Sequence, residues 1–155
     1  MKTTRFSSLL LACAFAALPA IAKPNFTGDW KVNLSKSTFG QMPAPNSMTS
    51  KIAHDEPKLK VSNKQSSDRG DFAADFDYTT DGKECTNQIM GNPMKSTLKW
   101  DGDTLLIDSK AKFGDNDVNM QDKMTLSEDG KTLTIIRLFK SSMGEMEQKV
   151  VFEKQ

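Results

Sequence analysis

The sequence predicts an all-β protein, an antiparallel up-and-down β-barrel of about ten strands. Three observations support this prediction. Turn motifs recur about every 10–14 residues over most of the chain, hydrophobic and polar residues alternate between them, and no amphipathic helix of useful length follows residue 22. Short strands with turns at this spacing are typical of sandwiches and barrels. Consecutive antiparallel strands that share one apolar face usually protect their edges by closing into a barrel.

The first 22 residues are predicted to be a signal peptide. Lys2 and Arg5 give a positive start, Leu9–Leu18 is apolar, and a small-x-small cleavage sequence ends at Ala22. The apolar run is shorter than the roughly 20 residues of a membrane-spanning helix, so no transmembrane segment is expected. We therefore expect export to the periplasm or the cell exterior, with cleavage after Ala22. A lipoprotein-type site at Cys13 is a less favoured alternative, because the apolar run before it is short.

Residues 23–155 are predicted to form a single domain without a strong charge bias. Removal of the two signal-peptide cations leaves 19 Lys and Arg against 20 Asp and Glu, and the two signs are interspersed. No basic stripe is present, which argues against nucleic acid or an anionic membrane surface as partners. Cys85 is the only cysteine of this segment, so an internal disulfide is excluded. A small buried hydrophobe is favoured for it over a reactive thiol or an intermolecular bridge.

The first predicted strand covers Phe26–Leu34, where apolar and polar residues alternate. The connection Ser35–Ser47 contains two prolines and a glycine, so it is predicted as an irregular loop at the barrel mouth. Nine further strands follow, each joined to the next by a tight turn. Three turns are Asp-Gly pairs, the strongest short signal for a hairpin. The predicted turns are Asp55–Pro57, Ser67–Asp71, Asp81-Gly82, Gly91–Pro93, Asp101-Gly102, Gly114–Asp117, Asp129-Gly130 and Ser142–Gly144.

The later strands alternate in the same way. Apolar residues share one face in the segments 72–79, 94–100, 105–113, 118–126 and 145–153. Both faces of Leu133–Phe139 are apolar, so the direction of Arg137 within it stays open. Asp122 and Gln148 fall on the apolar faces of their strands, which is typical of a barrel whose cavity orients a ligand through a few polar groups. Internal polar networks with ordered water, or a break in register, are the alternatives.

Four motifs carry a resemblance to a known group of proteins. They are FTGDWKVNLSKSTFGQMPAP at Phe26–Pro45, TTDGKE at Thr79–Glu84, KWDGDTL at Lys99–Leu105 and LSEDGKTL at Leu126–Leu133. With them the chain resembles the calycins, the group of lipocalins and fatty-acid-binding proteins, and more closely a family of small exported bacterial proteins with a lipocalin-like domain. The resemblance covers nearly all of residues 23–155 and implies the barrel fold, but no settled activity. The segment between the first two strands is too short for the helix pair of fatty-acid-binding proteins.

The resemblance also implies how one end of the barrel closes. In calycins the tryptophan of the first strand closes one end, and a late-strand arginine commonly packs on it. Gly28 and Trp30 match the first-strand pattern, and Arg137 is the candidate arginine. An arginine in an apolar strand needs a partner, because an unpaired buried charge is costly. Two roles for Arg137 stay open, stacking on Trp30 or contacting a ligand, and Asp122 is predicted as its ion-pair partner.

We expect a non-enzymatic protein that binds a small apolar or amphipathic molecule inside the barrel. Arg137, with Asp122 or Gln148, is predicted to orient the ligand. The alternative is a protein-interaction or inhibitor module of the cell envelope with a filled barrel, in which the mouth loop and turns would bind a protein partner. The predicted wall residues are Phe76, Tyr78, Trp100, Phe113, Met120 and Met124.

No catalytic residue, cofactor or metal site is predicted. The motifs of nucleophile elbows and zinc metalloproteases are absent. His54 is the only histidine and is expected to be a surface residue. Methionine pairs such as Met120 with Met124 are potential Cu(I) ligands. Their positions on apolar faces favour packing over metal binding.

Overall fold

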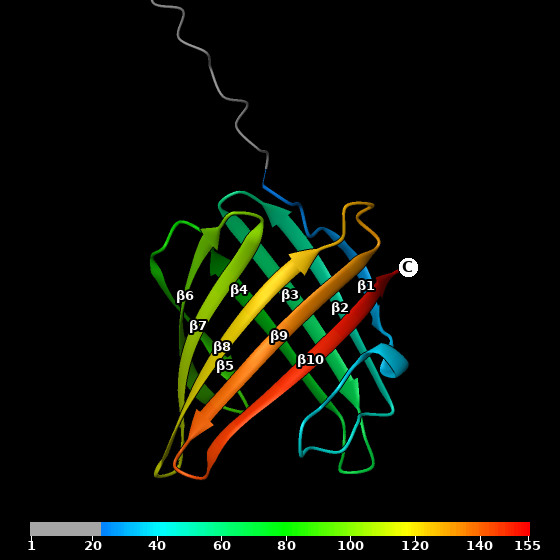
Figure 1. Ribbon diagram of the computed structural model, residues 1–155. Helices are drawn as coiled ribbons and strands as arrows, with labels where there is room; N and C mark the ends of the chain where they lie inside the picture. The colour runs from blue at the N-terminus through cyan, green and yellow to red at the C-terminus, as the bar shows by residue number, and fades with distance from the viewer. Residues whose placement is uncertain (1–22) are drawn as a thin grey trace, which may run out of the picture.

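The computed structural model describes residues 23–155, so the predicted signal peptide and the alternative site at Cys13 lie outside the described residues. The described part of the chain contains ten strands and one short 3-10 helix (Figure 1). One strand precedes the long connection and nine follow it, which confirms the predicted strand count. The elements are β1 (Gly28–Val32), η1 (Leu34–Lys36), β2 (Ser47–Asp55), β3 (Lys58–Ser66), β4 (Phe72–Thr79), β5 (Glu84–Ile89), β6 (Asn92–Asp101), β7 (Thr104–Phe113), β8 (Asn116–Leu126), β9 (Thr132–Ser141) and β10 (Gly144–Lys154).

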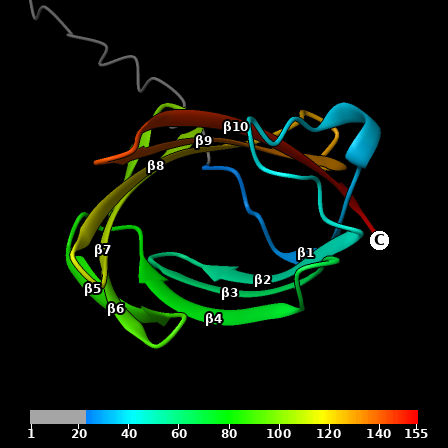
Figure 2. The ribbon, with the colours of Figure 1, turned by 90° about the horizontal axis from the view of Figure 1, so that it is seen from below.

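All ten strands belong to one antiparallel sheet, in the order β4-β3-β2-β1-β10-β9-β8-β7-β6-β5. Strand β1 pairs with β2 on one side and with β10 on the other, so the first and last strands lie side by side. Trp30 stands opposite Ser50 of β2 and Lys154 of β10. Viewed from below, the sheet curves into a nearly closed ring (Figure 2). The predicted fold class, an antiparallel up-and-down β-barrel, is confirmed.

Each of the eight predicted turns joins two consecutive strands. The turn predicted at Gly91–Pro93 lies earlier, at Met90-Gly91, and Pro93 already belongs to β6. Both turn residues have positive φ, 49° for Met90 and 75° for Gly91. Two-residue hairpin turns of type I′ need positive φ at both positions, so Met90 takes the strained conformation that asparagine or glycine usually provides.

Large side chains fill one end of the barrel, the end where β2 turns into β3 and where the chain finishes (Figure 1). The indole Nε1 of Trp30 donates a hydrogen bond to the backbone oxygen of Phe26 at 3.0 Å, so burial leaves this donor satisfied. Phe26 lies in the segment before β1 and is fully buried, so this residue acts as a plug for this end of the barrel. The most buried large side chains are Phe26, Trp30, Leu59, Leu98, Leu105 and Leu133.

Lys154, and not Arg137, packs on Trp30. The Lys154 Nζ lies 5.4 Å from the centroid of the indole ring, where the pairing of β1 with β10 puts it. Gly28 makes room for this side chain, because a Cβ atom at Gly28 would lie 2.7 Å from Lys154 Cε. Of the two roles left open for Arg137, stacking on Trp30 is therefore not found. A salt bridge with Asp122 holds Arg137 inside the barrel instead.

Cys85 is half-buried and packs against the core from β5. Its thiol donates a hydrogen bond to the backbone oxygen of Ser96 at 3.3 Å. Burial raises the pKa of the Cys85 thiol, which disfavours the reactive thiolate form. This environment fits the favoured interpretation of a small hydrophobe.

Around the ring, β4 and β5 are the only neighbouring described strands that no ladder of backbone hydrogen bonds joins. The gap between them forms a seam in the barrel wall. The side chain of Asn87 on β5 bridges it. Its Oδ1 accepts a hydrogen bond from the backbone nitrogen of Asp77 at 2.7 Å, and its Nδ2 donates to the backbone oxygen of Asp77 at 3.0 Å. One buried amide thus satisfies the backbone donor and acceptor of a residue on β4, as a paired strand would.

Replacing Asn87 with alanine should weaken this seam. The change removes two hydrogen bonds and leaves the Asp77 backbone groups without these partners, at a cost of about 1–3 kcal/mol in the free energy of unfolding. Asn92→Ala is the matched control, because the Asn92 amide also donates to a backbone oxygen, but through an exposed hydrogen bond at the start of β6. Urea unfolding and hydrogen exchange of the Asp77 amide measure the effect. Equal losses in the two variants would contradict a role for Asn87 in the seam.

Candidate ligand-binding site

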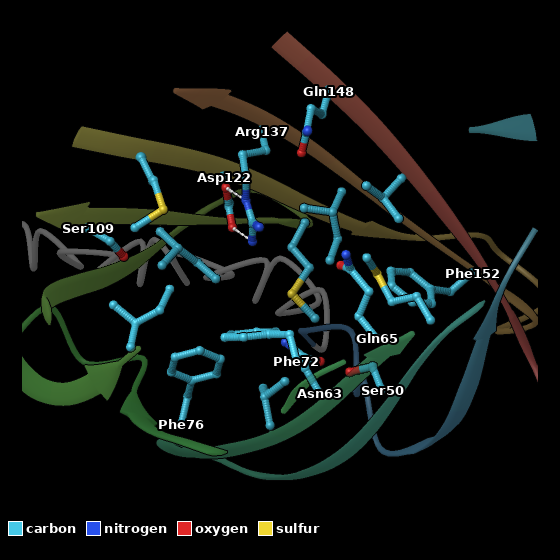
Figure 3. Close-up of a pocket in the computed structure, with 18 of the residues that line it drawn as sticks. Ser50, Asn63, Gln65, Phe72, Phe76, Ser109, Asp122, Arg137, Gln148 and Phe152 are labelled. Carbon is cyan, nitrogen blue, oxygen red and sulfur yellow. Dashed lines mark hydrogen bonds and ion pairs between the residues drawn. The ribbon is translucent and has the colours of Figure 1, made fainter. Parts of the chain in front are cut away.

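A cavity of about 220 Å³ lies inside the barrel, towards the end opposite the Phe26 plug. Side chains of every strand except β1 line it, and so does the connection before β2. Most of these side chains are apolar, and a few polar groups are distributed among them (Figure 3). A partly open cavity of this composition suits a small molecule whose surface is mainly apolar.

Asp122 of β8 and Arg137 of β9 form an ion pair in the cavity wall. The two residues stand opposite each other in the β8–β9 ladder, and their side chains project together into the cavity (Figure 3). Arg137 Nε donates to Asp122 Oδ1 at 2.7 Å, and Arg137 Nη2 donates to Asp122 Oδ2 at 2.6 Å. The pair predicted from the sequence is therefore present. Arg137 lines the cavity together with Ile135 and Phe139, which lie on the same face of β9. This face of β9 therefore points into the barrel.

The electrostatic state of the pair follows from its surroundings. Burial opposes the charge of the guanidinium, but the adjacent Asp122 carboxylate outweighs this and raises the pKa of Arg137 above its usual range. The Arg137 side chain is still 35% exposed, whereas that of Asp122 is 11% exposed. Because Arg137 lies inside the barrel, its exposed surface faces the cavity. Arg137 is therefore a permanently charged group with donors directed towards the cavity.

Phe76 and Tyr78 of β4 form the wall across the cavity. Their rings stack with centroids 5.6 Å apart. Burial raises the pKa of the Tyr78 phenol well above its usual range, so the hydroxyl stays protonated and uncharged. Tyr78 thereby offers an apolar ring together with a neutral group that can donate and accept hydrogen bonds.

The other polar groups at the cavity are neutral, and two of them are already engaged. Ser109 shares a hydrogen bond of 2.8 Å with Ser96. Gln148 Nε2 donates to the backbone oxygen of Phe39 at 3.3 Å, which ties the connection before β2 to β10. The remaining polar lining residues are Ser50, Asn63 and Gln65.

The predicted mouth loop borders the cavity as part of its wall. Strand β1 ends at Val32, and the following connection takes its place between β10 and β2 (Figure 2). Thr38 forms two backbone hydrogen bonds with Lys149 of β10, at 2.8 and 2.9 Å. The side chains of this loop that line the cavity are Phe39, Met42, Pro43 and Pro45. Sequence reasoning did not identify them, because a proline-rich loop has no periodicity that assigns an inner face.

The structure brings seven of the nine predicted site residues to the cavity and leaves two outside it. Trp100 stacks on Phe26 at the plugged end, with ring centroids 5.7 Å apart, and so does not line the cavity. Phe113, at the end of β7, packs in a cluster with Met94 and is also absent from the lining. Both predictions are wrong, because alternation identifies the inner face of a strand but not the level along the barrel. The residues placed at the cavity are Arg137, Asp122, Gln148, Phe76, Tyr78, Met120 and Met124.

His54 is buried, so its expected surface position is wrong. Its ring stacks on Phe26, its Nδ1 accepts a hydrogen bond from the backbone nitrogen of Phe26 at 3.3 Å, and its Nε2 meets Glu56 Oε1 at 3.0 Å. Glu56 also accepts hydrogen bonds from Trp100 Nε1 at 2.8 Å and from Thr80 Oγ1 at 2.6 Å. The group holds the plug in place, and none of its members lines the cavity.

Within residues 23–155, no group of three or more His, Cys, Asp and Glu side chains is arranged to hold a metal ion. The described methionines lie in different environments. Met90 and Met143 lie on exposed turns, whereas Met94, Met120 and Met124 are buried. A search of the same residues for helices long and apolar enough to cross a membrane finds none.

No protein-family model matches this chain, and no curated protein matches it by sequence. Solved structures do match. Zebrafish ileal bile-acid-binding protein in complex with cholic acid has a TM-score of 0.57 and 14% identity, over 84% of this chain and 98% of that chain. A secretory abundant heat soluble protein of Ramazzottius varieornatus has a TM-score of 0.55 and 14% identity, over 83% and 94%. Fatty-acid-binding protein 1 of Echinococcus granulosus has a TM-score of 0.51 and 10% identity, over 83% and 96%.

At these identities the likeness concerns the fold alone. Together with the ten-stranded antiparallel ring, it defines a calycin-type β-barrel with the architecture of fatty-acid-binding and bile-acid-binding proteins. The chain departs from the helical connection expected for fatty-acid-binding proteins, because only η1 and an irregular loop join β1 to β2. The narrower resemblance to small exported bacterial proteins stays a prediction.

Removing the charge of Glu56 should make stability less dependent on pH. Partial burial opposes this charge, but hydrogen bonds from Thr80, His54 and Trp100 outweigh it and lower the pKa of Glu56. A carboxylate with a lowered pKa stabilises the fold above its unfolded pKa, and this contribution is lost as pH falls through the folded pKa. Glu56→Gln should therefore melt at a lower temperature than the parent protein at pH 7, and the difference should shrink towards about pH 3.

Thermal unfolding followed by circular dichroism across this pH range measures the effect. Glu128→Gln is the control, because Glu128 lies on the exposed turn between β8 and β9. A constant offset between Glu56→Gln and the parent protein at every pH would contradict the role assigned to the Glu56 charge.

Adding a side chain at Gly40 should detach the loop from the cavity wall. Gly40 has a φ of +63°, and a Cβ atom there would lie 2.8 Å from the backbone oxygen of Glu147. Gly102→Ala is the matched control, because Gly102 has a φ of +58° but open space around its Cβ position. Both variants should lose about 1–2 kcal/mol to left-handed strain. Gly40→Ala should lose more and should speed hydrogen exchange of the Thr38 amide; equal effects in both variants would contradict this close packing.

Proposed function

We propose that this protein is a non-enzymatic binding protein that holds a small apolar or amphipathic molecule inside the barrel. The observation that carries the proposal is the cavity itself, with apolar walls and the charged pair Asp122–Arg137 on one side. A barrel that served only as a scaffold would gain stability from filling this space with apolar side chains.

Binding energy would come mainly from the apolar walls. Burial of apolar surface contributes about 25 cal/mol per Å². Phe76, Tyr78, Met120 and Met124 provide such surface, and methionine adapts to ligands of different shape. The cavity of about 220 Å³ is smaller than the ~300–1,000 Å³ of common ligand sites, which favours a small molecule or a short chain.

The structural neighbours support the proposal at the level of fold. One of them was solved with cholic acid, and another is named a fatty-acid-binding protein. The shared architecture is therefore compatible with an amphipathic ligand inside the barrel. The predicted signal peptide adds the proposal that binding takes place in the periplasm or outside the cell.

Filling the cavity should weaken binding without unfolding the protein. Met120→Trp places a larger side chain, with an indole ring, in the cavity, and Met143→Trp makes the same change on an exposed turn. Fluorescence titration with 1-aminoanthracene, a small neutral amphipathic probe, measures the affinity. Met120→Trp should weaken binding at least about tenfold and Met143→Trp should leave it unchanged. Circular dichroism checks that both variants remain folded.

Absence of binding in the parent protein would overturn the proposal. The decisive observation would be no titration with 1-aminoanthracene together with a clean mass in native mass spectrometry after exposure to a lipid extract. A protein-interaction module would then be the better interpretation, with the loop and turns as its binding surface. Pull-down with the intact protein would test it.

A further inference from the structure

We propose that the cavity selects a ligand with an uncharged polar head, such as a hydroxyl or a carboxamide, and discriminates against a free carboxylate. This inference rests on the proposed binding function and names the ligand class. It follows from the way in which Asp122 and Arg137 share the cavity wall (Figure 3).

The charge of Arg137 is already neutralised. Among the described residues that line the cavity, Asp122 and Arg137 are the only charged ones, so the lining has no net charge. A carboxylate entering this space would be removed from water without gaining an unpaired cation. Burial of an uncompensated charge is costly, and a protonated amine would meet the same difficulty.

The position of Asp122 adds a local repulsion. Both carboxylate oxygens lie within 2.7 Å of Arg137 nitrogens. A ligand carboxylate that reached the free donors of Arg137 would therefore come close to a second carboxylate. Two carboxylates at one site disfavour each other strongly, and one of them tends to take up a proton.

The free hydrogen-bonding capacity of the pair suits a neutral head. Arginine has five N–H donors, and the contacts with Asp122 use one on Nε and one on Nη2. Three donors remain, both on Nη1 and one on Nη2. Each oxygen of Asp122 keeps acceptor capacity beyond the bond it receives. Donors and acceptors thus lie side by side, which a hydroxyl or carboxamide can satisfy together and a carboxylate, which only accepts, cannot.

The remaining polar groups of the cavity provide no second cation. Tyr78 is an uncharged phenol, and the amides of Asn63 and Gln65 lie near the opposite wall (Figure 3). Ser109 is engaged with Ser96, and Gln148 with the loop. All of these groups are compatible with neutral ligands that carry hydrogen-bonding substituents.

A matched series of ten-carbon ligands tests the inference on the parent protein. Decanamide, 1-decanol, decanoic acid and decylamine have the same chain and differ only in the head group. Competition against bound 1-aminoanthracene at pH 7.5, where the acid and the amine are ionised, gives the four affinities. Decanamide and 1-decanol should bind at least about tenfold more tightly than decanoate and decylammonium. Decanoate binding as tightly as decanamide would overturn this inference and leave the proposed function standing.

Variants then assign the selectivity to the pair. Asp122→Asn frees the charge of Arg137 and should shift the preference towards decanoate by at least about tenfold. Asp108→Asn removes the same charge from the outer face of β7 and should leave the preference unchanged. An unchanged preference in folded Asp122→Asn would overturn the role of the pair. If the parent protein binds neither 1-aminoanthracene nor any decyl ligand, the proposed function fails, and this inference fails with it.

Discussion

The interior of a closed ten-stranded sheet is too wide for its own side chains to fill, and the rest of this structure depends on that constraint. At one end the chain before β1 supplies Phe26, which stacks with His54 and Trp100 and fills the space. At the other end no comparable plug exists within the described residues, and a cavity of about 220 Å³ remains. The short strand β1 leaves part of the wall to an irregular loop, so the cavity is bordered by the least regular segment of the barrel.

The proposed binding function explains the ion pair in that cavity better than a contribution to stability does. Removing two charges from water costs free energy that their attraction only partly returns, and apolar residues of similar volume often serve a core equally well. The bidentate geometry fixes both side chains in one arrangement before any ligand arrives. A site prepared in this way loses little conformational entropy on binding.

Much of the fold could be predicted from the sequence, because alternation and Asp-Gly turns are local signals. They specify strands, faces and turns, and they placed Asp122 inside the barrel. The level of a residue along the barrel depends on register between strands, which no local pattern encodes, and Trp100 was assigned to the wrong end for that reason. The burial of His54 depends on Phe26, a partner 28 residues away in sequence. Phe39 and Met42 line the cavity from an irregular loop, and contacts with Gln148 of β10 set the path of this loop.

The pairing of β1 with β10 has a consequence for how the chain folds. Eight of the nine ladders join strands that are consecutive in sequence, and only this one joins the two ends. The entropic cost of closing a loop rises with its length, so we expect the local hairpins to form before the end-to-end ladder. Strands β4 and β5 share no ladder, and the meanders β1–β4 and β5–β10 can therefore assemble as separate units. The last kinetic step would then be their union through β1 and β10, which encloses the cavity only when the final strand is in place.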